Sequence, residues 1–317
     1  MFQQTIKNSI SLTGVGAHSG NKATVTLCPA ADNHGIIFKR TDINGPQNII
    51  PALWSYVTDT KLCTKISNNS GVFVSTIEHV MAALAAKKID NVLIEVNGPE
   101  IPILDGSAQP FFEALTTAEP VSQRSARNYL KVLKPITVNQ GDIWAEIKPS
   151  TENKFSLAYT FRNRGTNHFE TYQSQDVIED FETDLASART FGFLEDVQKL
   201  WEAGLAKGSS LDNAVVFDRE TILNPEGLRF PEECARHKVL DIVGDLYLAG
   251  MPVIGAFEGY CSGHSMNNTL LRKLLNDRSA WTIESPQMNR REDHTHPFLR
   301  FNKADSSHAI SPRFGTY

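Results

Sequence analysis

The sequence predicts an α+β fold built from two similar units, in which each half has strands ahead of a helix, then a strand and a second helix. Three observations lead to this prediction: short extended runs separated by turn residues, two helical patterns in each half, and a polar segment between the halves. A doubly wound parallel sheet is disfavoured, because strands and helices do not alternate strictly. The identity between the halves is too low to define a repeat.

The first half begins with extended runs at residues 23–28 and 35–39, which are separated by Gly, Asn and Asp. A helix is predicted from Ser75 through Lys88, since its apolar residues recur at helical spacing and its basic end suits a helix C-terminus. A strand at 91–96 and a second helix at 109–117 complete the unit.

The segment 119–125 is polar, contains a proline and shows no periodicity, so we place the domain boundary there. This predicts an N-terminal domain at 1–121, a C-terminal domain at 126–284 and a polar tail at 285–317. The tail contains His294 and His296, whose spacing resembles a metal pair, but two histidines in a polar tail are more often solvated.

The second half repeats the order of elements. Strands are predicted at 143–147 and 155–159, followed by a helix at 232–248, a strand at 253–260 and a helix at 266–275.

Residues 192–224 interrupt this order as an insert. Apolar side chains recur there at helical spacing: Leu194, Val197, Leu200 and Trp201. They form either a small amphipathic insert packed on its own domain or an apolar wall for a lipid-like substrate. The pattern alone favours the packed insert.

Composition excludes several functions. The formal net charge of -5 argues against general nucleic-acid binding, which usually needs a basic face. We expect a cytoplasmic protein, because the chain starts without an export signal and has no apolar run of the ~18 residues that span a bilayer. A monomer is also expected. The four cysteines form no C-x-x-C pair, so they indicate neither a disulfide framework nor a thiolate zinc site, and buried free thiols are expected. Any metal ligands are then expected among His and carboxylate side chains.

The strongest local motif lies in the predicted helix at 232–248. Residues four apart share one helix face, so His237, Asp241 and Asp245 form a polar stripe on an otherwise apolar helix. A histidine and a carboxylate one turn apart are a natural two-ligand face for zinc. The alternative is a solvated face with an i,i+4 interaction, and the motif alone leaves the two readings equal.

Glu78 and His79 form a second, weaker motif. Ser75 and Glu78 fit a capping box, and His79 fits a core histidine, so both residues have an ordinary structural interpretation. A catalytic zinc site, however, takes three protein ligands and leaves one position open. One histidine from the first half, beside a glutamate able to accept a proton, would complete the site.

Two further segments carry side chains of interest. His264 stands between an apolar strand and a helix, where it either caps the helix or stays protonated beside a carboxylate such as Asp245 and opposes negative charge. Thr190 offers a hydroxyl next to two aromatic residues, which by itself is an ordinary strand end.

Taken together, these motifs resemble the bacterial UDP-3-O-acyl-N-acetylglucosamine deacetylases, the zinc amidases of lipid A synthesis. The resemblance covers most of the chain, and the motifs that carry it occur in one order: GVGAHSG at 14–20, TIEHVMAAL at 76–84, DGSA at 105–108, ARTFGF at 188–193, HKVLDIVGDLYL at 237–248 and SGHSMNN at 262–268. Any one of them could arise by chance, but the ordered set is specific.

The resemblance implies two β-α-α-β domains in a sandwich, with helices packed between the sheets and the active site where the domains meet. It implies a Zn²⁺ ion, a UDP-linked acylated glucosamine as substrate, and hydrolysis of the N-acetyl group to release acetate. The implied zinc ligands are His79, His237 and Asp241.

The resemblance also implies a role for each remaining site residue. Glu78 would be the general base and His264 the acid or electrostatic partner, and either could protonate the leaving amine. Asp245 would orient His264. Thr190 would donate a hydrogen bond to the oxyanion. Lys238 and His18 would lie near the substrate's phosphates. Phe191 and the insert would border the passage for the acyl chain. The resemblance therefore favours the insert as an apolar wall for the substrate over an insert that is only packed on its own domain.

The chain departs from the family pattern at two positions. Cys261 and Ile143 stand where members of the family often carry basic residues near the nucleotide's phosphates. Weaker phosphate binding, or phosphate binding by Lys238 and His18, is therefore expected. The competing functions are a zinc deacetylase of another N-acetylated sugar or small amide, and a two-domain binding protein with a structural metal.

Overall fold

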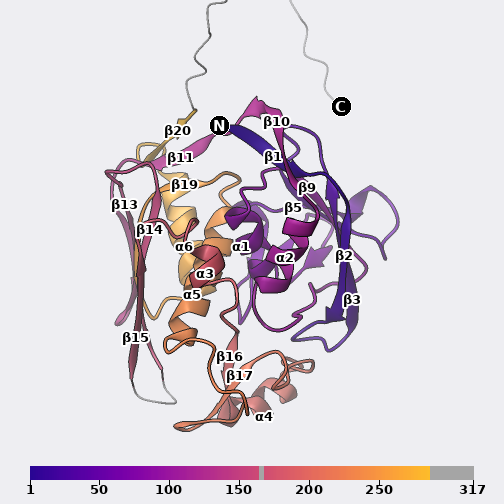
Figure 1. Cartoon of the computed structure of the whole chain (residues 1–317), viewed down its shortest axis with the longest axis vertical. Coiled ribbons are helices and arrows are strands. Elements are labelled where there is room, and N and C mark those ends of the chain that lie inside the picture. Colours follow the sequence, from indigo (N-terminus) through magenta and orange to yellow (C-terminus); the bar gives the residue numbers. More distant parts are fainter. Residues whose placement is uncertain (164–167, 286–317) are drawn as a thin grey trace, which may run out of the picture. The chain divides into compact units, whose positions relative to one another are not determined.

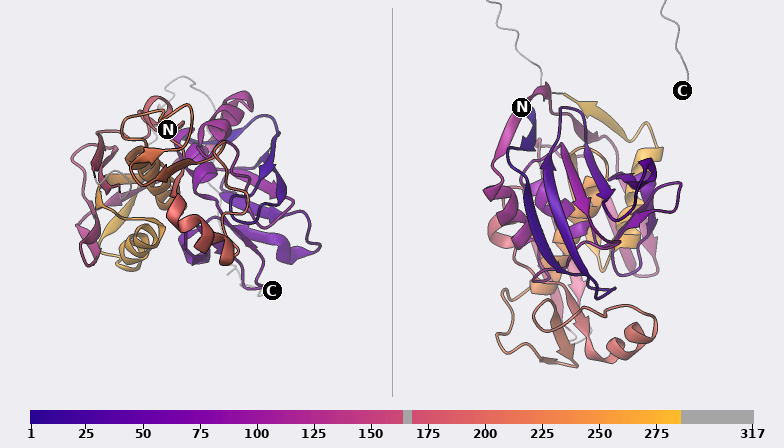
Figure 2. Two further views of the ribbon diagram at one scale, coloured as in Figure 1. Left: turned by 90° about the horizontal axis from the view of Figure 1, so that it is seen from below. Right: turned by 90° about the vertical axis from the view of Figure 1, so that its right-hand side faces the viewer.

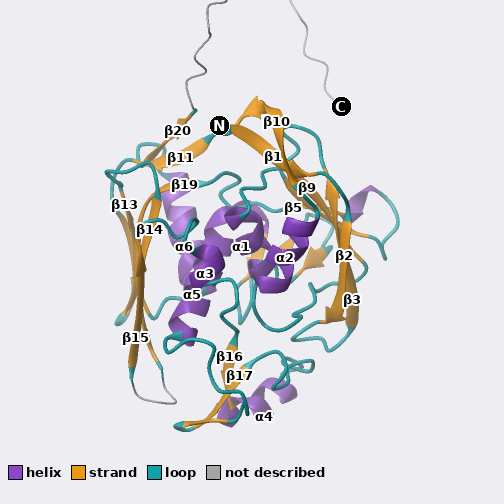
Figure 3. Cartoon of the chain, viewed as in Figure 1, coloured by secondary structure: helices purple, strands orange, loops and turns teal. Residues whose placement is uncertain are grey.

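The computed structural model describes residues 1–163 and 168–285. Helices fill the space between two large β-sheets, one formed mainly by the first half of the chain and one by the second (Figures 1 and 3). The predicted α+β class is confirmed. The division into two domains near residues 121–126 stays a prediction, and the predicted tail lies outside the described residues except for Ser285.

Six α-helices are present in the described part of the chain. They are α1 (Glu78–Ala86), α2 (Gln109–Thr117), α3 (Phe181–Asp184), α4 (Leu194–Glu202), α5 (Glu233–Tyr247) and α6 (His264–Asn276), with short 3-10 turns η1 (Pro46–Asn48) and η2 (Trp54–Tyr56). None of these helices is long and apolar enough to cross a lipid bilayer.

The sheet of the first half has five strands in the order β2-β3-β9-β4-β5. It faces the viewer in the right-hand panel of Figure 2, with the helices behind it. Its strands are β2 (Ile10–Val15), β3 (Lys22–Pro29), β4 (Ile36–Arg40), β5 (Ile49–Pro51) and β9 (Val92–Val96). All neighbours are antiparallel except β4 and β9, which run parallel.

The sheet of the second half has seven strands built around β19, which pairs with β11, β13 and β14. Its members are β11 (Tyr129–Val132), β12 (Ile136–Gln140), β13 (Ile143–Lys148), β14 (Phe155–Arg162), β15 (Phe169–Ser174), β19 (Val253–Tyr260) and β20 (Trp281–Glu284). Alternate residues of β14 are buried against the helices, as expected for a sheet with one covered face.

Three smaller sheets complete the described strands. The first contains β6 (Val57–Asp59), β7 (Lys65–Ser67) and β8 (Phe73–Val74), the second contains β16 (Phe191–Phe193), β17 (Val215–Asp218) and β18 (Thr221–Ile222), and the third pairs β1 (Phe2–Ile6) with β10 (Pro120–Ala126).

One segment contains a strand that was not predicted, and one local prediction is wrong. The segment 119–125, where the domain boundary is placed, contains most of β10, which pairs antiparallel with β1 near the start of the chain. The helix expected from Ser75 begins at Glu78, because Ser75 donates its backbone N–H to Pro99 and Thr76 has a positive φ of 58°. Ser75 therefore does not cap α1, and the capping box is absent.

The centre of the molecule is the contact between α1 and α5. Every residue of α1 from Glu78 to Ala85 is buried, and most of them are small or aliphatic. Gly244 on α5 faces this helix so closely that an added Cβ would lie 2.1 Å from the carbonyl oxygen of Glu78. The missing side chain thus lets the backbones of the two helices approach each other beside the site described next.

Candidate metal centre and adjoining cleft

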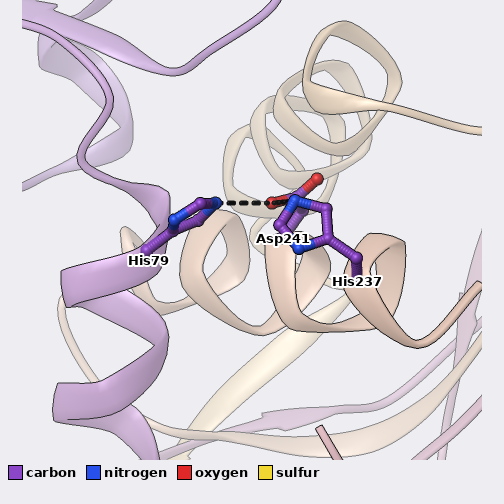
Figure 4. Close-up of side chains that lie close together, drawn as sticks. All are labelled: His79, His237 and Asp241. Carbon is purple, nitrogen blue, oxygen red and sulfur yellow. Dashed lines mark ion pairs between the residues drawn. The ribbon is translucent and has the colours of Figure 1, made fainter. Parts of the chain in front are cut away.

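Three potential metal ligands converge between α1 and α5. His79 projects from the first turn of α1 toward His237 and Asp241, which lie one turn apart on α5 (Figure 4). One ligand atom from each residue lies within 4.8 Å of the others. All three side chains are buried, so this is a polar cluster inside an apolar layer.

The cluster has the geometry and unmet bonding capacity of a metal site. The Nε2 atoms of His79 and His237 lie 3.7 and 3.6 Å from Oδ1 of Asp241, too far for hydrogen bonds. Among the described residues, Oδ1 of Asp241 has no hydrogen-bond partner although it is buried. Two imidazole nitrogens and one carboxylate oxygen around a common point match the three-ligand sets of catalytic zinc sites, so the residues fit Zn²⁺.

Both histidines are prepared to act as neutral ligands. Burial lowers the pKa of His79 to about 3, helped by repulsion from His237, and burial also lowers the pKa of His237. The Nδ1 atom of His237 lies 3.0 Å from the carbonyl oxygen of Ala188. Because a carbonyl only accepts, the proton is on Nδ1, and the lone pair of Nε2 faces the other ligands.

Asp241 stays ionised because the ammonium group of Lys238 and the imidazoles around it favour its charged form. Burial alone would raise its pKa, but Lys238 and the nearby histidines hold the pKa well below its usual range. Nζ of Lys238 donates to Oδ2 of Asp241 at 2.8 Å. That bond occupies Oδ2 and leaves Oδ1 directed at the two imidazoles.

Glu78 is buried one residue before His79 and has a basicity suited to proton transfer. Burial raises its pKa to about 7, against the attraction of His264. Its Oε2 atom accepts the backbone N–H of Thr64 at 3.0 Å, while Oε1 lies 3.9 Å from Nε2 of His264. The interpretation of Glu78 as a helix cap is therefore wrong, and the carboxylate faces the cluster.

His264 opens α6 and is held by Asp245. Its Nδ1 donates to Oδ2 of Asp245 at 2.9 Å, and its Nε2 lies 3.8 Å from Oδ2 of Asp241. Burial alone would lower the pKa of His264, but Asp245, Asp241 and Glu78 raise it to about 9. The site thus combines a buried carboxylate that can accept a proton near neutral pH with a cation directly beside it.

Two residues that touch this pair were not found from the sequence. Thr64 donates its hydroxyl to Oδ1 of Asp245 at 2.6 Å, and the amide of Asn267 donates to Oδ2 at 2.9 Å. Asn267 lies in the SGHSMNN motif, one turn after His264 on α6, which is a signal that could have indicated it. Thr64 carries no such signal, since it lies 181 residues from Asp245 and follows an unremarkable turn.

A cleft of about 1200 Å³ lies beside the cluster, since its lining includes Lys238, which donates to Asp241, and His264, whose Nε2 is 3.8 Å from Asp241. Thr190, Phe191 and, from α4, Leu200 also line this cleft. A second pocket of about 250 Å³ lies between Tyr247, Phe155 and Arg127, and its lining includes neither Lys238 nor His264. The larger cleft is therefore the one that adjoins the chemistry.

Phe191 and Thr190 lie in the cleft beside the residues of α5. The ring of Phe191 lies edge-on to His237 at 6.3 Å between centroids, with Nζ of Lys238 5.5 Å from its centre. The backbone N–H of Thr190 donates to Gly106 at 2.7 Å, which fixes the segment that carries its hydroxyl. Ile143 and Cys261, the two departures from the family pattern, also line this cleft.

The insert contributes an open apolar face. No residue of α4 is buried, and Leu194 and Trp201 are 43% and 57% exposed. The small core of this region is formed instead by Val215, Phe217 and Cys234. α4 packs against β16 and β17 of the insert with Val197 and Leu200 half-buried, so both interpretations of the insert stay open.

His18 lies apart from the cleft wall but within electrostatic range of His264. Burial lowers its pKa, partly opposed by Glu100, and the charge of His264 lowers it further. Its backbone N–H donates to Glu100 at 2.8 Å, and its buried Nδ1 has no hydrogen-bond partner in the described structure.

Comparison with known proteins matches residues 3–276 to the family model of UDP-3-O-acyl N-acetylglycosamine deacetylases. Among similar curated proteins, the UDP-3-O-acyl-N-acetylglucosamine deacetylase of Histophilus somni is 48% identical over 284 residues, 89% of this chain and 93% of the relative. The proteins of that name from Shewanella frigidimarina and Neisseria meningitidis serogroup C are each 45% identical, over 90% and 89% of this chain and 93% and 92% of their own lengths.

Proposed function

Because the chain belongs to the UDP-3-O-acyl-N-acetylglucosamine deacetylase family, we propose that it performs the reaction of that family with a zinc ion held by His79, His237 and Asp241. The reaction is hydrolysis of the N-acetyl group of a UDP-3-O-acyl-N-acetylglucosamine, a deacetylation in lipid A biosynthesis that releases acetate. The single observation that carries the proposed site is the convergence of three buried ligand atoms with an unpartnered Oδ1 on Asp241.

A zinc ion in this position would act as a Lewis acid that polarises the acetyl carbonyl and makes a water molecule more acidic. The protein supplies the proton acceptor. Glu78 lies beside the ligands with one oxygen held by Thr64 and the other free toward the site, and a pKa of about 7 lets it take a proton from water at neutral pH.

Charge stabilisation falls to His264 and Thr190. Asp245 holds His264 as a cation, with Nε2 directed at the site, where it opposes the negative charge that develops on the acetyl oxygen. The Thr190 hydroxyl at the cleft wall is the second donor. Both Glu78 and His264 are placed to return a proton to the departing sugar nitrogen.

We assign the rest of the cleft to substrate binding. Lys238 on the cleft wall, and His18 off that wall, would meet the anionic part of the substrate. Ile143 and Cys261 leave fewer cations in the cleft than the family pattern provides. Phe191 and α4 would border the 3-O-acyl chain, since the apolar side chains of Phe191, Leu200 and Leu205 line this part of the cleft. A cytoplasmic, monomeric enzyme stays the prediction from the sequence.

The deciding experiment measures metal content and acetate release together. We expect about one zinc per chain, loss of both zinc and turnover on chelation, and recovery of both when zinc is added back. Turnover of the 3-O-acylated substrate should exceed that of its unacylated analogue, whereas equal turnover would favour a deacetylase of another N-acetylated sugar. A bound metal whose removal leaves acetate release unchanged would favour a structural metal.

A further inference from the structure

Thr64 forms hydrogen bonds with both Glu78 and Asp245, the carboxylate that holds His264. It is 2% exposed and uses its backbone and its side chain separately. The backbone N–H donates to Oε2 of Glu78 at 3.0 Å, and the hydroxyl donates to Oδ1 of Asp245 at 2.6 Å. Its carbonyl also accepts from the backbone of Ile77, the residue before Glu78.

The direction of the side-chain bond follows from its partners. Asp245 accepts only, so the single hydroxyl proton of Thr64 lies between Oγ1 and Oδ1. Nδ1 of His264 is 2.9 Å from Oδ2 of Asp245 but 3.4 Å from Oγ1, so its proton goes to the carboxylate. The carboxylate of Asp245 therefore receives donors on both oxygens: Thr64 on Oδ1, and His264 and Asn267 on Oδ2.

This arrangement determines which way His264 faces. A carboxylate held on only one oxygen can turn about its Cβ–Cγ bond, and the imidazole bonded to it would turn with it. With Oδ1 anchored, the ring of His264 keeps Nε2 3.9 Å from Oε1 of Glu78. Because the same residue anchors Oε2 of Glu78, the two groups share one point of attachment.

We propose that Thr64 is a positioning residue that fixes the Glu78 carboxylate and the Asp245–His264 pair relative to each other through its backbone N–H and its hydroxyl. This inference rests on the proposed function, since it concerns the geometry of the groups assigned there. It assigns no direct contact with substrate to Thr64.

The matched variants are Thr64→Val and Thr64→Ser. Valine keeps the branched shape and the backbone N–H to Glu78 and removes only the hydroxyl, whereas serine restores the hydroxyl. For Thr64→Val we expect kcat to fall roughly 10- to 100-fold, the range for losing a hydrogen bond to a charged group, with KM and zinc content within about 2-fold of wild type. Thr64→Ser should recover kcat to within about 3-fold.

Non-additivity separates positioning from a general structural effect. In an Asp245→Ala background, Thr64→Val should lower kcat by less than about 2-fold further, because the hydroxyl then has nothing to hold. A full additional loss in that background, an unchanged kcat in Thr64→Val, or no recovery in Thr64→Ser would each overturn the inference.

A measurement independent of turnover uses the metal-free protein. The Nδ1–H proton of His264, bonded to Asp245, should give a downfield NMR resonance in wild type and Thr64→Ser that is shifted or broadened in Thr64→Val. An unchanged resonance in Thr64→Val would contradict the inference. Failure of the proposed function is distinguishable, since it would appear as no zinc-dependent acetate release from the wild-type protein itself.

Discussion

Gly244 on α5 lies directly against the backbone of Glu78 on α1, where a Cβ would stand 2.1 Å from the Glu78 carbonyl oxygen. This contact joins the helix that carries His237 and Asp241 to the helix that carries His79. The distance between the proposed ligands therefore depends on the absence of one side chain.

We predict that Gly244→Ala destabilises the fold and weakens zinc binding. Alanine gains up to about 1 kcal/mol in helix propensity, but overpacking against backbone costs about 1–3 kcal/mol, so the net effect is a loss measured by urea unfolding. The matched control is Gly98→Ala, because a Cβ there meets only Ala23 at 3.9 Å. Equal stability and zinc affinity in the two variants would show that the helices can separate without consequence.

Glu78→Gln and His237→Ala should both lower turnover but should differ in their effect on bound metal. Glutamine keeps the size of Glu78 but cannot accept a proton, so we expect bound zinc to remain and kcat to fall about 10²- to 10⁴-fold. Removing the His237 imidazole leaves two ligands, so zinc should be lost together with turnover. Metal analysis and acetate release on the same samples test both, and a Glu78→Gln enzyme with wild-type kcat would remove Glu78 from the mechanism.

The metal-free protein should lose stability as the pH rises from about 7.5 to 9.5. The pKa of His264 is about 9 in the fold against 6.5 for an unperturbed histidine, so the folded state holds the proton more tightly. Its contribution is fully present below pH 6.5 and is lost as the pH rises through 9, with an upper limit on the order of 3 kcal/mol. Urea unfolding of chelated protein at both pH values measures this loss.

The control for this pH dependence is His264→Gln, which has no proton to lose in the same range. Glu78 titrates lower, near 7, and His79 near 3, so neither produces the loss above pH 7.5. The variant should show a smaller decrease between the two pH values. A decrease equal to that of wild type would assign it to other groups.

Ile143→Lys should strengthen binding of the anionic substrate. Ile143 is 39% exposed and lines the same cleft as Lys238, so a lysine there adds a solvated cation without disturbing the core. We expect KM for the UDP-linked substrate to fall about 3-fold at low salt, and the gain to shrink as salt screens the charge. Ile283→Lys, at a residue 50% exposed on β20 and outside the cleft, should leave KM unchanged.

The free cysteines should divide into two reactive and two unreactive thiols. Burial raises the pKa of Cys63 to about 12, with a further contribution from Glu78, and burial also raises the pKa of Cys234. Cys28 and Cys261 are partly exposed. At pH 8 a thiol reagent should therefore titrate at most two groups in the folded protein and four in urea, and rapid reaction of Cys63 in the folded state would contradict the structure.

The sequence was most informative where local pattern and chemistry agree. The bounds of α2 and β19 match the prediction, and those of α5 and β9 differ by about one residue, because each is an apolar run with clear ends. The His237 and Asp241 pair was recognisable because helical periodicity places both on one face. That His79 joins them depended on the resemblance, since only the fold brings residues so distant in sequence together.

The features that the sequence did not predict share a physical cause. Each depends on a contact between residues far apart in the sequence. The pairing of β10 with β1 relies on backbone hydrogen bonds between residues about 120 positions apart, and polar side chains on an edge strand show no periodic pattern. The supposed capping box failed because Ser75 bonds to Pro99 instead of to α1. Thr64 was missed because nothing near it in sequence indicates that Asp245 is its partner.

The proposed ligands are divided between two segments that begin about 160 residues apart, with His79 on α1 and the other two on α5. If the polypeptide were severed in a surface loop between those helices, neither fragment would contain three ligands. Zinc binding by the mixed fragments would then report their reassociation, and chelation would promote their dissociation. In the intact enzyme the ion would similarly connect distant parts of the chain. The supply of metal would then affect the stability of the protein as well as its turnover.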